Sequence, residues 1–335
     1  MSGIAGGDAG GAGGAALGAG VAALVAAIAL ALVMRNVERL PKAQPNARSL
    51  HERPVCRVGG LSIWAGWLPA LWLSGAPFPA GLAGGVGWIA IVLVCLLDDW
   101  RGVPPAARLA VHLVAAALAA SALPGVAGAL GLAVATLVIA WSSNLYNFMD
   151  GSDGLAATMA VLGFAALAAG AWVAAAPSAP LLALAAAVVP LLVVNAPPAR
   201  VFMGDIGAVP LGFLAALFGI AGWGDGVWPA WFPVTVFLPF IADASATLLR
   251  RALRGERVWE AHRSHYYQRL HQLGAGHRGT LLVFGALMAG TGGSAVLALA
   301  TGASGVGVLA GWLLALGALF AGIDYHWRTR QRKTR

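Results

Sequence analysis

Long apolar segments separated by short polar loops recur along almost the whole sequence. A membrane-spanning helix needs about 20 mainly apolar residues, and eleven segments qualify, near 14–34, 58–75, 80–97, 107–123, 126–143, 155–175, 179–195, 207–223, 230–249, 280–300 and 304–324. Charged residues make up only 10% of the 335 residues, against about a quarter in soluble domains. We therefore expect an all-α, polytopic membrane bundle of about ten or eleven transmembrane helices, forming a single domain over residues 1–335.

The Lys and Arg residues lie in alternate loops. If the first segment runs from outside to inside, all 21 of them, counting Arg108, fall on the inner side, in loops 35–57, 98–106, 144–154, 196–206 and 250–279 and the tail from 325. Cytoplasmic loops attract these residues. We therefore expect the N-terminus outside and the C-terminus in the cytoplasm, with residues 1–13 a flexible tail and 325–335 a basic cytoplasmic tail. The dispersed positive charge suits membrane lipids and anionic substrates rather than nucleic acid.

Acidic residues are scarce, and most of the 13 gather toward the inner face. A carboxylate near hydrocarbon is costly unless it is paired, hydrated or functional. Mg²⁺ prefers one or two protein carboxylates, with water and phosphate oxygens completing its octahedron. A shared divalent-cation site is therefore favoured over helix capping for the five acids of three short inner loops: Asp98, Asp99, Asp150, Asp153 and Asp205.

Asp98 and Asp99 end the third apolar segment. A helix C-terminus already carries partial negative charge, and the two carboxylates repel each other. Arg101 compensates them if the pair is structural; a bound cation or a proton-transfer role is the functional alternative.

The inner loop 250–279 is rich in cationic and hydrogen-bonding residues. His262, His265 and Arg269 recur at spacings of three and four, which align on one helical face, and Arg263 lies among them. Such a face suits phosphate oxygens; a zinc site and a solvated basic helix are the alternatives. Asp243, about two turns inside the ninth segment, is expected to face the bundle interior.

Acidic loops that hold a divalent cation beside basic loops that hold phosphate, all at the lipid–water boundary, favour phosphoryl transfer. Such chemistry consists mostly of positioning and charge neutralisation. The residues alone do not name the nucleotide, lipid or sugar.

At these positions the sequence resembles the polyprenyl-phosphate N-acetylhexosamine-1-phosphate transferases, a glycosyltransferase family 4 type. The resemblance spans nearly the whole chain. Five blocks carry it in order: 45–51 (PNARSLH) with Gly59 and Gly60, then Asp98-Asp99, 147–155 (NFMDGSDGL), 202–207 (FMGDIG) and 262–270 (HRSHYYQRL).

The resemblance implies transfer of a sugar 1-phosphate from a UDP-N-acetyl-sugar to undecaprenyl phosphate, with release of UMP. It implies dependence on Mg²⁺, with Mn²⁺ as a substitute, and a multi-pass protein of the bacterial inner membrane with a cytoplasmic active site, compatible with a homodimer. The product would initiate cell-envelope polysaccharide synthesis. The O-antigen or capsule branch is favoured over the phospho-N-acetylmuramoyl-pentapeptide branch, since Asp98-Asp99 lacks that branch's nearby Lys and the last loop lacks its consecutive histidines.

The resemblance also assigns roles. It implies Asp205 and Asp99 as metal ligands. It implies catalytic roles for Asp98, Asp99, Asp150 and Asp153. It implies that the substrates contact seven residues: Asn147, His262, Arg263, His265, Arg269, Arg48 and His51. Ala208 stands where many members have Ser, which removes a hydroxyl near the metal loop.

Other classes of protein share some of these features. A secondary transporter would place its site near the bilayer midplane, whereas the acids here lie in loops and shallow turns. A CDP-alcohol phosphotransferase or a lipid phosphatase would release CMP or inorganic phosphate instead of UMP. A non-catalytic lipid-binding scaffold would leave the Asp clusters unexplained.

Overall fold

The computed structural model describes residues 8–43, 54–258, 260 and 262–333, and these are almost entirely helical. The first half consists of α1 (Asp8–Arg35), the short η1 (Val37–Arg39), β1 (Lys42–Ala43), β2 (Val55–Cys56), α2 (Leu61–Leu73), α3 (Gly81–Arg101), α4 (Pro105–Ala120) and α5 (Gly128–Met149). The second half consists of α6 (Leu155–Val173), α7 (Ala179–Asn195), α8 (Asp205–Gly224), α9 (Trp231–Val236), α10 (Leu238–Leu253), α11 (Tyr266–Leu270), the π-helical turn η2 (His271–Ala275), α12 (Gly276–Thr301) and α13 (Gly305–Lys333).

Seven helical segments of the described chain are long and apolar enough to cross a membrane, and α2, α4 and α7 are shorter apolar helices. The expectation of an all-α, polytopic membrane protein is confirmed. The predicted span 230–249 is instead two helices, α9 and α10, which meet at Phe237. Pro239 follows directly, and a proline lacks the N–H needed to continue a helical hydrogen-bond ladder.

The two ends of the chain differ from the expectation of tails. Helix α1 begins at Asp8, so residues 8–13 are helical rather than a flexible tail, while residues 1–7 lie outside the described part. Three of these six residues are glycine, a weak helix former, so local propensity did not predict this first turn of the helix. At the other end α13 continues to Lys333, which places Arg328, Arg330, Arg332 and Lys333 on a helix.

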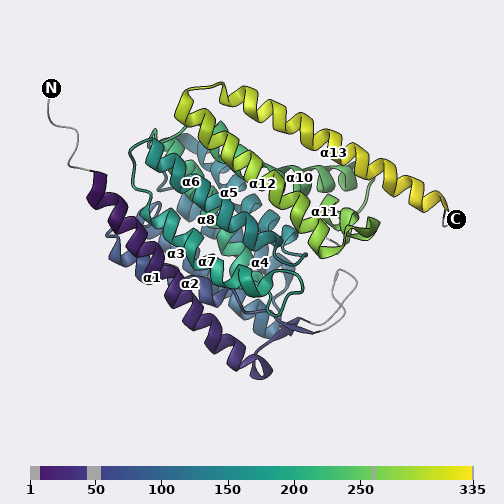
Figure 1. The fold of residues 1–335 in the computed structure, drawn as a ribbon, viewed down its shortest axis with the longest axis horizontal. Helices are drawn as coiled ribbons and strands as arrows, with labels where there is room; N and C mark the ends of the chain where they lie inside the picture. Colours follow the sequence, from purple (N-terminus) through teal and green to yellow (C-terminus); the bar gives the residue numbers. More distant parts are fainter. Residues whose placement is uncertain (1–7, 44–53, 259, 261, 334–335) are drawn as a thin grey trace.

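Small residues let the helices approach closely. Helix α1 packs against α2 and α7, α3 against α4 and α8, α5 against α8, and α6 against α7 and α12. A side chain at Gly66 of α2 would place its Cβ 2.3 Å from the carbonyl oxygen of Ala22 in α1. Close backbone approach of this kind is typical of membrane helix interfaces. Figure 1 shows α1 and α13 at opposite edges of the bundle.

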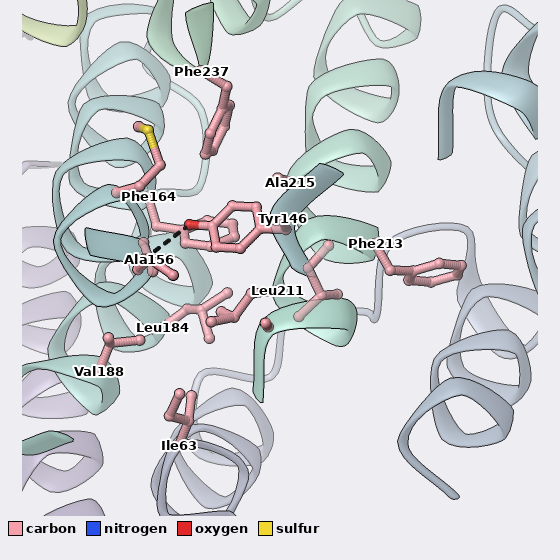
Figure 2. Packing of buried hydrophobic residues seen from close by; sticks show 14 of the residues in the cluster. Ile63, Tyr146, Ala156, Phe164, Leu184, Val188, Leu211, Phe213, Ala215 and Phe237 are labelled. Carbon is pink, nitrogen blue, oxygen red and sulfur yellow. Dashed lines mark hydrogen bonds between the residues drawn. The ribbon is translucent and has the colours of Figure 1, made fainter. Parts of the chain in front are cut away.

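The core lies around α5, α6 and α8. Figure 2 shows Tyr146 and Phe164 pointing toward one another between these helices, and the hydroxyl of Tyr146 donates to the carbonyl of Ala156 at 3.5 Å. Phe237 packs on Phe164 with ring centroids 5.9 Å apart. The two-residue strands β1 and β2 pair antiparallel between α1 and α2. This rigid packing fixes the helix ends that carry the inner loops.

Candidate functional site

The loop before α8 is joined to the chain after β2 by backbone hydrogen bonds. Phe202 N–H donates to the Cys56 carbonyl at 2.8 Å, and Gly59 N–H donates back to the Phe202 carbonyl at 3.0 Å. Gly204 has a φ of +73°, and a Cβ there would lie 1.7 Å from the Arg57 carbonyl oxygen. Only glycine fits this conformation and this contact. Two segments far apart in the sequence thereby bring Arg57 beside the start of α8.

Asp99 is buried at the end of α3 and is held from two sides. Its Oδ1 lies 2.5 Å from Nη2 of Arg57, and its Oδ2 accepts a hydrogen bond from the N–H of Ile206 at 3.2 Å. A buried carboxylate requires such partners because desolvation penalises its charge.

Asp98, the neighbouring acid, points to α4. Its Oδ2 accepts from Nη1 of Arg108, and its Oδ1 accepts from the N–H of Val103 at 2.7 Å. The structural alternative, in which Arg101 compensates the acidic pair, does not hold, because Arg101 is exposed and the cations in contact are Arg57 and Arg108.

Asp205, the first residue of α8, shares Arg108 with Asp98. Nη1 of Arg108 lies 2.7 Å from Asp205 Oδ2 and also contacts Asp98. The side-chain amide of Asn147, near the end of α5, donates to the same Asp205 oxygen at 3.4 Å. The three acidic inner loops therefore converge, and one guanidinium bridges two of them.

Asp150 follows the last residue of α5 and receives the N–H of Gly204. Burial, followed by the negative charges of Asp205 and Asp99, raises the pKa of Asp150 well above its usual range. Burial is the larger cause of this rise, and the two neighbouring carboxylates add to it.

Asp153 is buried three residues further on and joins neighbouring segments. Its Oδ2 accepts from the N–H of Ala199 at 3.0 Å, and its Oδ1 lies 3.7 Å from Nδ1 of His277 in α12. The structure thus places Asp153 at the junction of the loop after α5, the loop after α7 and α12.

The donor set fits a divalent cation. Within the described ranges no group of three or more His, Cys, Asp and Glu forms a metal cluster, but Mg²⁺ needs only one or two carboxylates. Asp98 and Asp205 share the guanidinium group of Arg108, and Asp99 pairs with Arg57. Asp150 adds a fourth carboxyl group near Asp205 and Asp99, so acidic groups outnumber the cations in contact with them. Of the two expected ligands, Asp205 has an 18% exposed side chain and Asp99 0%, which makes Asp205 the more accessible.

The segment 262–270, called the histidine loop below, packs against the end of α5 and the loop that follows it. The ring of His265 stacks on Phe148 with centroids 6.0 Å apart, and the Tyr267 hydroxyl donates to the Phe148 carbonyl at 3.0 Å. Phe148 follows Asn147, which contacts Asp205. His265 is therefore connected to the acidic site through one aromatic ring.

His262 stacks on His265 with centroids 4.9 Å apart. Burial, followed by the neighbouring His265 and Arg251, lowers the pKa of His262 to about 4. His262 is therefore uncharged at neutral pH and offers hydrogen bonds rather than a positive charge. Helix α11 begins only at Tyr266, so the expectation that His262, His265 and Arg269 share one helical face is wrong: His262 lies in the irregular segment before the helix.

Arg269 faces α13. Its Nη1 lies 2.5 Å from Asp324 Oδ1, and its guanidinium lies over the rings of Tyr266 and Trp327. Arg250 binds the same Asp324 oxygen at 2.8 Å. Arg269 therefore connects α11 to α13.

Of the three further expected substrate contacts, only Arg263 lies among the described residues. Arg263 is exposed, and its carbonyl accepts from Gln272 at 3.0 Å. Arg48 and His51 lie outside the described residues.

Sequence reasoning missed three residues at or near the site: Arg57, Arg108 and Asp324. Asp243 is fully buried, as its position inside an apolar segment predicted, but its partner was not evident. For Asp324 the available signal was a single acid within the basic C-terminal end of α13.

Comparisons with known proteins show what this chain is similar to. Residues 82–223 match the family model described as glycosyl transferase family 4. A probable undecaprenyl-phosphate N-acetylglucosaminyl 1-phosphate transferase of Bacillus subtilis is 27% identical over 262 residues, 72% of each chain. A decaprenyl-phosphate N-acetylglucosaminephosphotransferase of Mycobacterium tuberculosis is 26% identical over 289 residues, 72% of this chain and 71% of that one. A phospho-N-acetylmuramoyl-pentapeptide-transferase of Heliobacterium modesticaldum is 34% identical over 147 residues, 42% of this chain and 44% of that one.

Proposed function

On the basis of the match of residues 82–223 to glycosyl transferase family 4, we propose that the chain transfers an N-acetylhexosamine 1-phosphate from a UDP-sugar to undecaprenyl phosphate. The products are UMP and a lipid-diphosphate-linked sugar. One observation carries the proposal: Arg108 bridges Asp98 and Asp205 where the acidic loops converge, beside Asn147 and Asp150. A site in which guanidinium groups lie beside carboxylates suits a reaction in which one phosphate attacks another, because such a reaction depends on positioning and on charge neutralisation.

The reaction joins two negatively charged groups. An oxygen of the acceptor phosphate attacks the phosphorus that carries the sugar; the bond from that phosphorus to the bridging oxygen breaks, and UMP leaves with that oxygen. A phosphate monoester has its second pKa at about 6, so the acceptor is already ionised at neutral pH. A dedicated base is dispensable, and the main task is to hold the two phosphates in line.

The residues divide this task. Arg57 and Arg108 reduce the repulsion between the carboxylates and the incoming phosphates. Asp98 and Asp99 fix the two guanidinium groups, while Asn147 contacts Asp205 and Asp150 lies near it.

Asp205, with Asp99 beside it, would hold Mg²⁺ or Mn²⁺, which supplies charge neutralisation to the diphosphate when bound. His262 and His265 lie against the same loop and offer hydrogen bonds to diphosphate oxygens.

The proposed location of the site in the cell rests on the distribution of the Lys and Arg residues. The inner loops hold the Lys and Arg residues, which supports a cytoplasmic site in the bacterial inner membrane. The names of two relatives, from B. subtilis and M. tuberculosis, specify N-acetylglucosamine, so UDP-N-acetylglucosamine is the first donor to test. Initiation of a cell-envelope polysaccharide, of the O-antigen or capsule type, and assembly as a homodimer remain part of the proposal.

The test uses purified protein with undecaprenyl phosphate, Mg²⁺ and a panel of UDP-sugars, and it measures the nucleotide released. Asp205→Asn should abolish UMP release. Asp225→Asn is the matched control, because Asp225 is an exposed acid at the other end of α8, about 30 Å away at 1.5 Å per residue, and should leave release unchanged. Release of CMP or inorganic phosphate, or UMP release that survives Asp205→Asn, contradicts the proposal.

A further inference from the structure

Asp243 of α10 is a fully buried carboxylate that contacts three residues at the start of α11, within the histidine loop. Its Oδ1 accepts from the N–H of Tyr266 at 2.9 Å and lies 3.2 Å from Nδ1 of His265. Its Oδ2 accepts from the N–H of Tyr267 at 2.9 Å, and Thr247, one turn along α10, donates to Oδ1 at 3.2 Å. Four contacts to one buried side chain specify its orientation.

These contacts determine which ring nitrogen of His265 carries hydrogen. A backbone N–H only donates, and each Asp243 oxygen already receives one. The carboxylate is therefore acting as an acceptor on both oxygens. Nδ1 of His265 must then carry a proton to bond with Oδ1. The same logic of a carboxylate that fixes a histidine tautomer operates in catalytic and metal-ligating histidines.

The ring is held in its plane as well as in its tautomer. His265 lies between Phe148, Tyr267 and His262, all nearly parallel to it, with interplanar angles of 28°, 25° and 28°. With Nδ1 engaged by Asp243, Nε2 is the ring nitrogen left for a ligand. Phe148 belongs to the loop that carries Asn147 and so connects this ring to Asp205.

We propose that Asp243 is a positioning residue: it holds His265 as the Nδ1–H tautomer against Phe148, so that Nε2 is presented to a diphosphate oxygen of the substrate. The proposal rests on the transferase function proposed above, since the substrate is the one named there. Asp243 itself does not touch substrate. The break between α9 and α10 at Phe237 sets the direction of the helix that carries Asp243 toward the loop.

The first test needs no turnover. Protein labelled with ¹⁵N-histidine reports the tautomer of each ring by NMR, and the signal of His265 is identified by its loss in His265→Gln. The wild-type ring should be in the Nδ1–H form, and Asp243→Asn should populate the Nε2–H form. A wild-type ring in the Nε2–H form, or a tautomer unchanged by Asp243→Asn, overturns the proposal.

The second test is a double-mutant cycle on kcat/KM for UMP release. Asp243→Asn should lower kcat/KM about 10- to 100-fold, the usual cost of removing a residue that orients a functional histidine. In a His265→Ala background the same change should cost less than about twofold, because the ring it positions is gone. Equal losses in both backgrounds mean that Asp243 acts only on folding, and they overturn the proposal.

Thr247→Val is the matched control. It removes one donor to Asp243 while keeping the side-chain volume, and it leaves the His265 contact in place. Its effect on kcat/KM should be the same with and without His265, and the tautomer should stay Nδ1–H. Thermal unfolding of each variant reports folding separately. If the wild type releases no UMP from any donor, the transferase proposal fails, while the tautomer measurement still decides whether Asp243 sets the state of His265.

Discussion

Replacement of Arg108 by Gln tests the central contact of the site. Nη1 of Arg108 contacts Oδ2 of Asp98 and Oδ2 of Asp205. Two oxygens on one nitrogen lie within about 5 Å of each other, and two charges at that distance repel by roughly 3 kcal/mol at an effective dielectric constant of about 20. At about 1.4 kcal/mol per tenfold, Arg108→Gln should lower kcat/KM by about 100-fold.

The assay is UMP release at several Mg²⁺ concentrations. Higher Mg²⁺ should restore part of the activity of Arg108→Gln, because a bound cation compensates the same carboxylates. Arg108→Lys should retain more activity than Gln but less than wild type, since an ammonium keeps the charge without the planar fork that reaches two carboxylates. Arg101→Gln is the control: Arg101 is exposed at the end of α3, and its loss should change kcat/KM less than twofold. A larger loss in Arg101→Gln than in Arg108→Gln would refute the assignment of Arg108 as the partner.

Three further predictions concern packing, pH and metal. Gly204→Ala should prevent stable folding, since its Cβ would lie 1.7 Å from the Arg57 carbonyl oxygen, whereas Gly226→Ala has the same φ of +73° and open space and should cost only about 1–2 kcal/mol; thermal unfolding in detergent compares them. The pKa of His262 in the folded protein is about 4 against an ordinary 6.5, so between these two pH values the unfolded chain binds a proton that the folded protein does not. The free energy of unfolding therefore falls as the pH drops from about 6.5 toward 4. His262→Gln should make the unfolding temperature depend less on pH over that window, and an unchanged dependence contradicts the lowered pKa. EDTA should abolish UMP release, and Mg²⁺ or Mn²⁺ should restore it; full activity in EDTA excludes the cation.

The resemblance to glycosyl transferase family 4 could be recognised from short blocks, because phosphate chemistry at a membrane restricts the residue types. Asp98 and Asp99 lie in the last turn of α3, Asp150 follows α5, and Asp205 begins α8. Helix ends on one side of a bundle meet, so their convergence could be anticipated. Which cation pairs with which acid could not.

The cationic partners depend on contacts between distant segments. Arg101 is two residues from Asp99 and was the natural candidate, but its side chain is exposed at the helix end. Arg57 and Arg108 reach the acids because the β2 segment pairs with the loop before α8 and because α4 packs on α3. Sequence proximity therefore gave the wrong ion pair.

Sequence alone determined that the chain is an all-α membrane protein with its clustered acids at the ends of apolar segments, because lipid demands about 20 apolar residues per span and makes a charge inside it costly. These requirements act locally along the chain. Only the tertiary structure decided that Arg108 bridges Asp98 and Asp205, that Asp243 holds His265, and that Arg269 pairs with Asp324. Each of these contacts depends on the packing of helices distant in sequence, and packing depends on side-chain shape at every interface, which no short motif records.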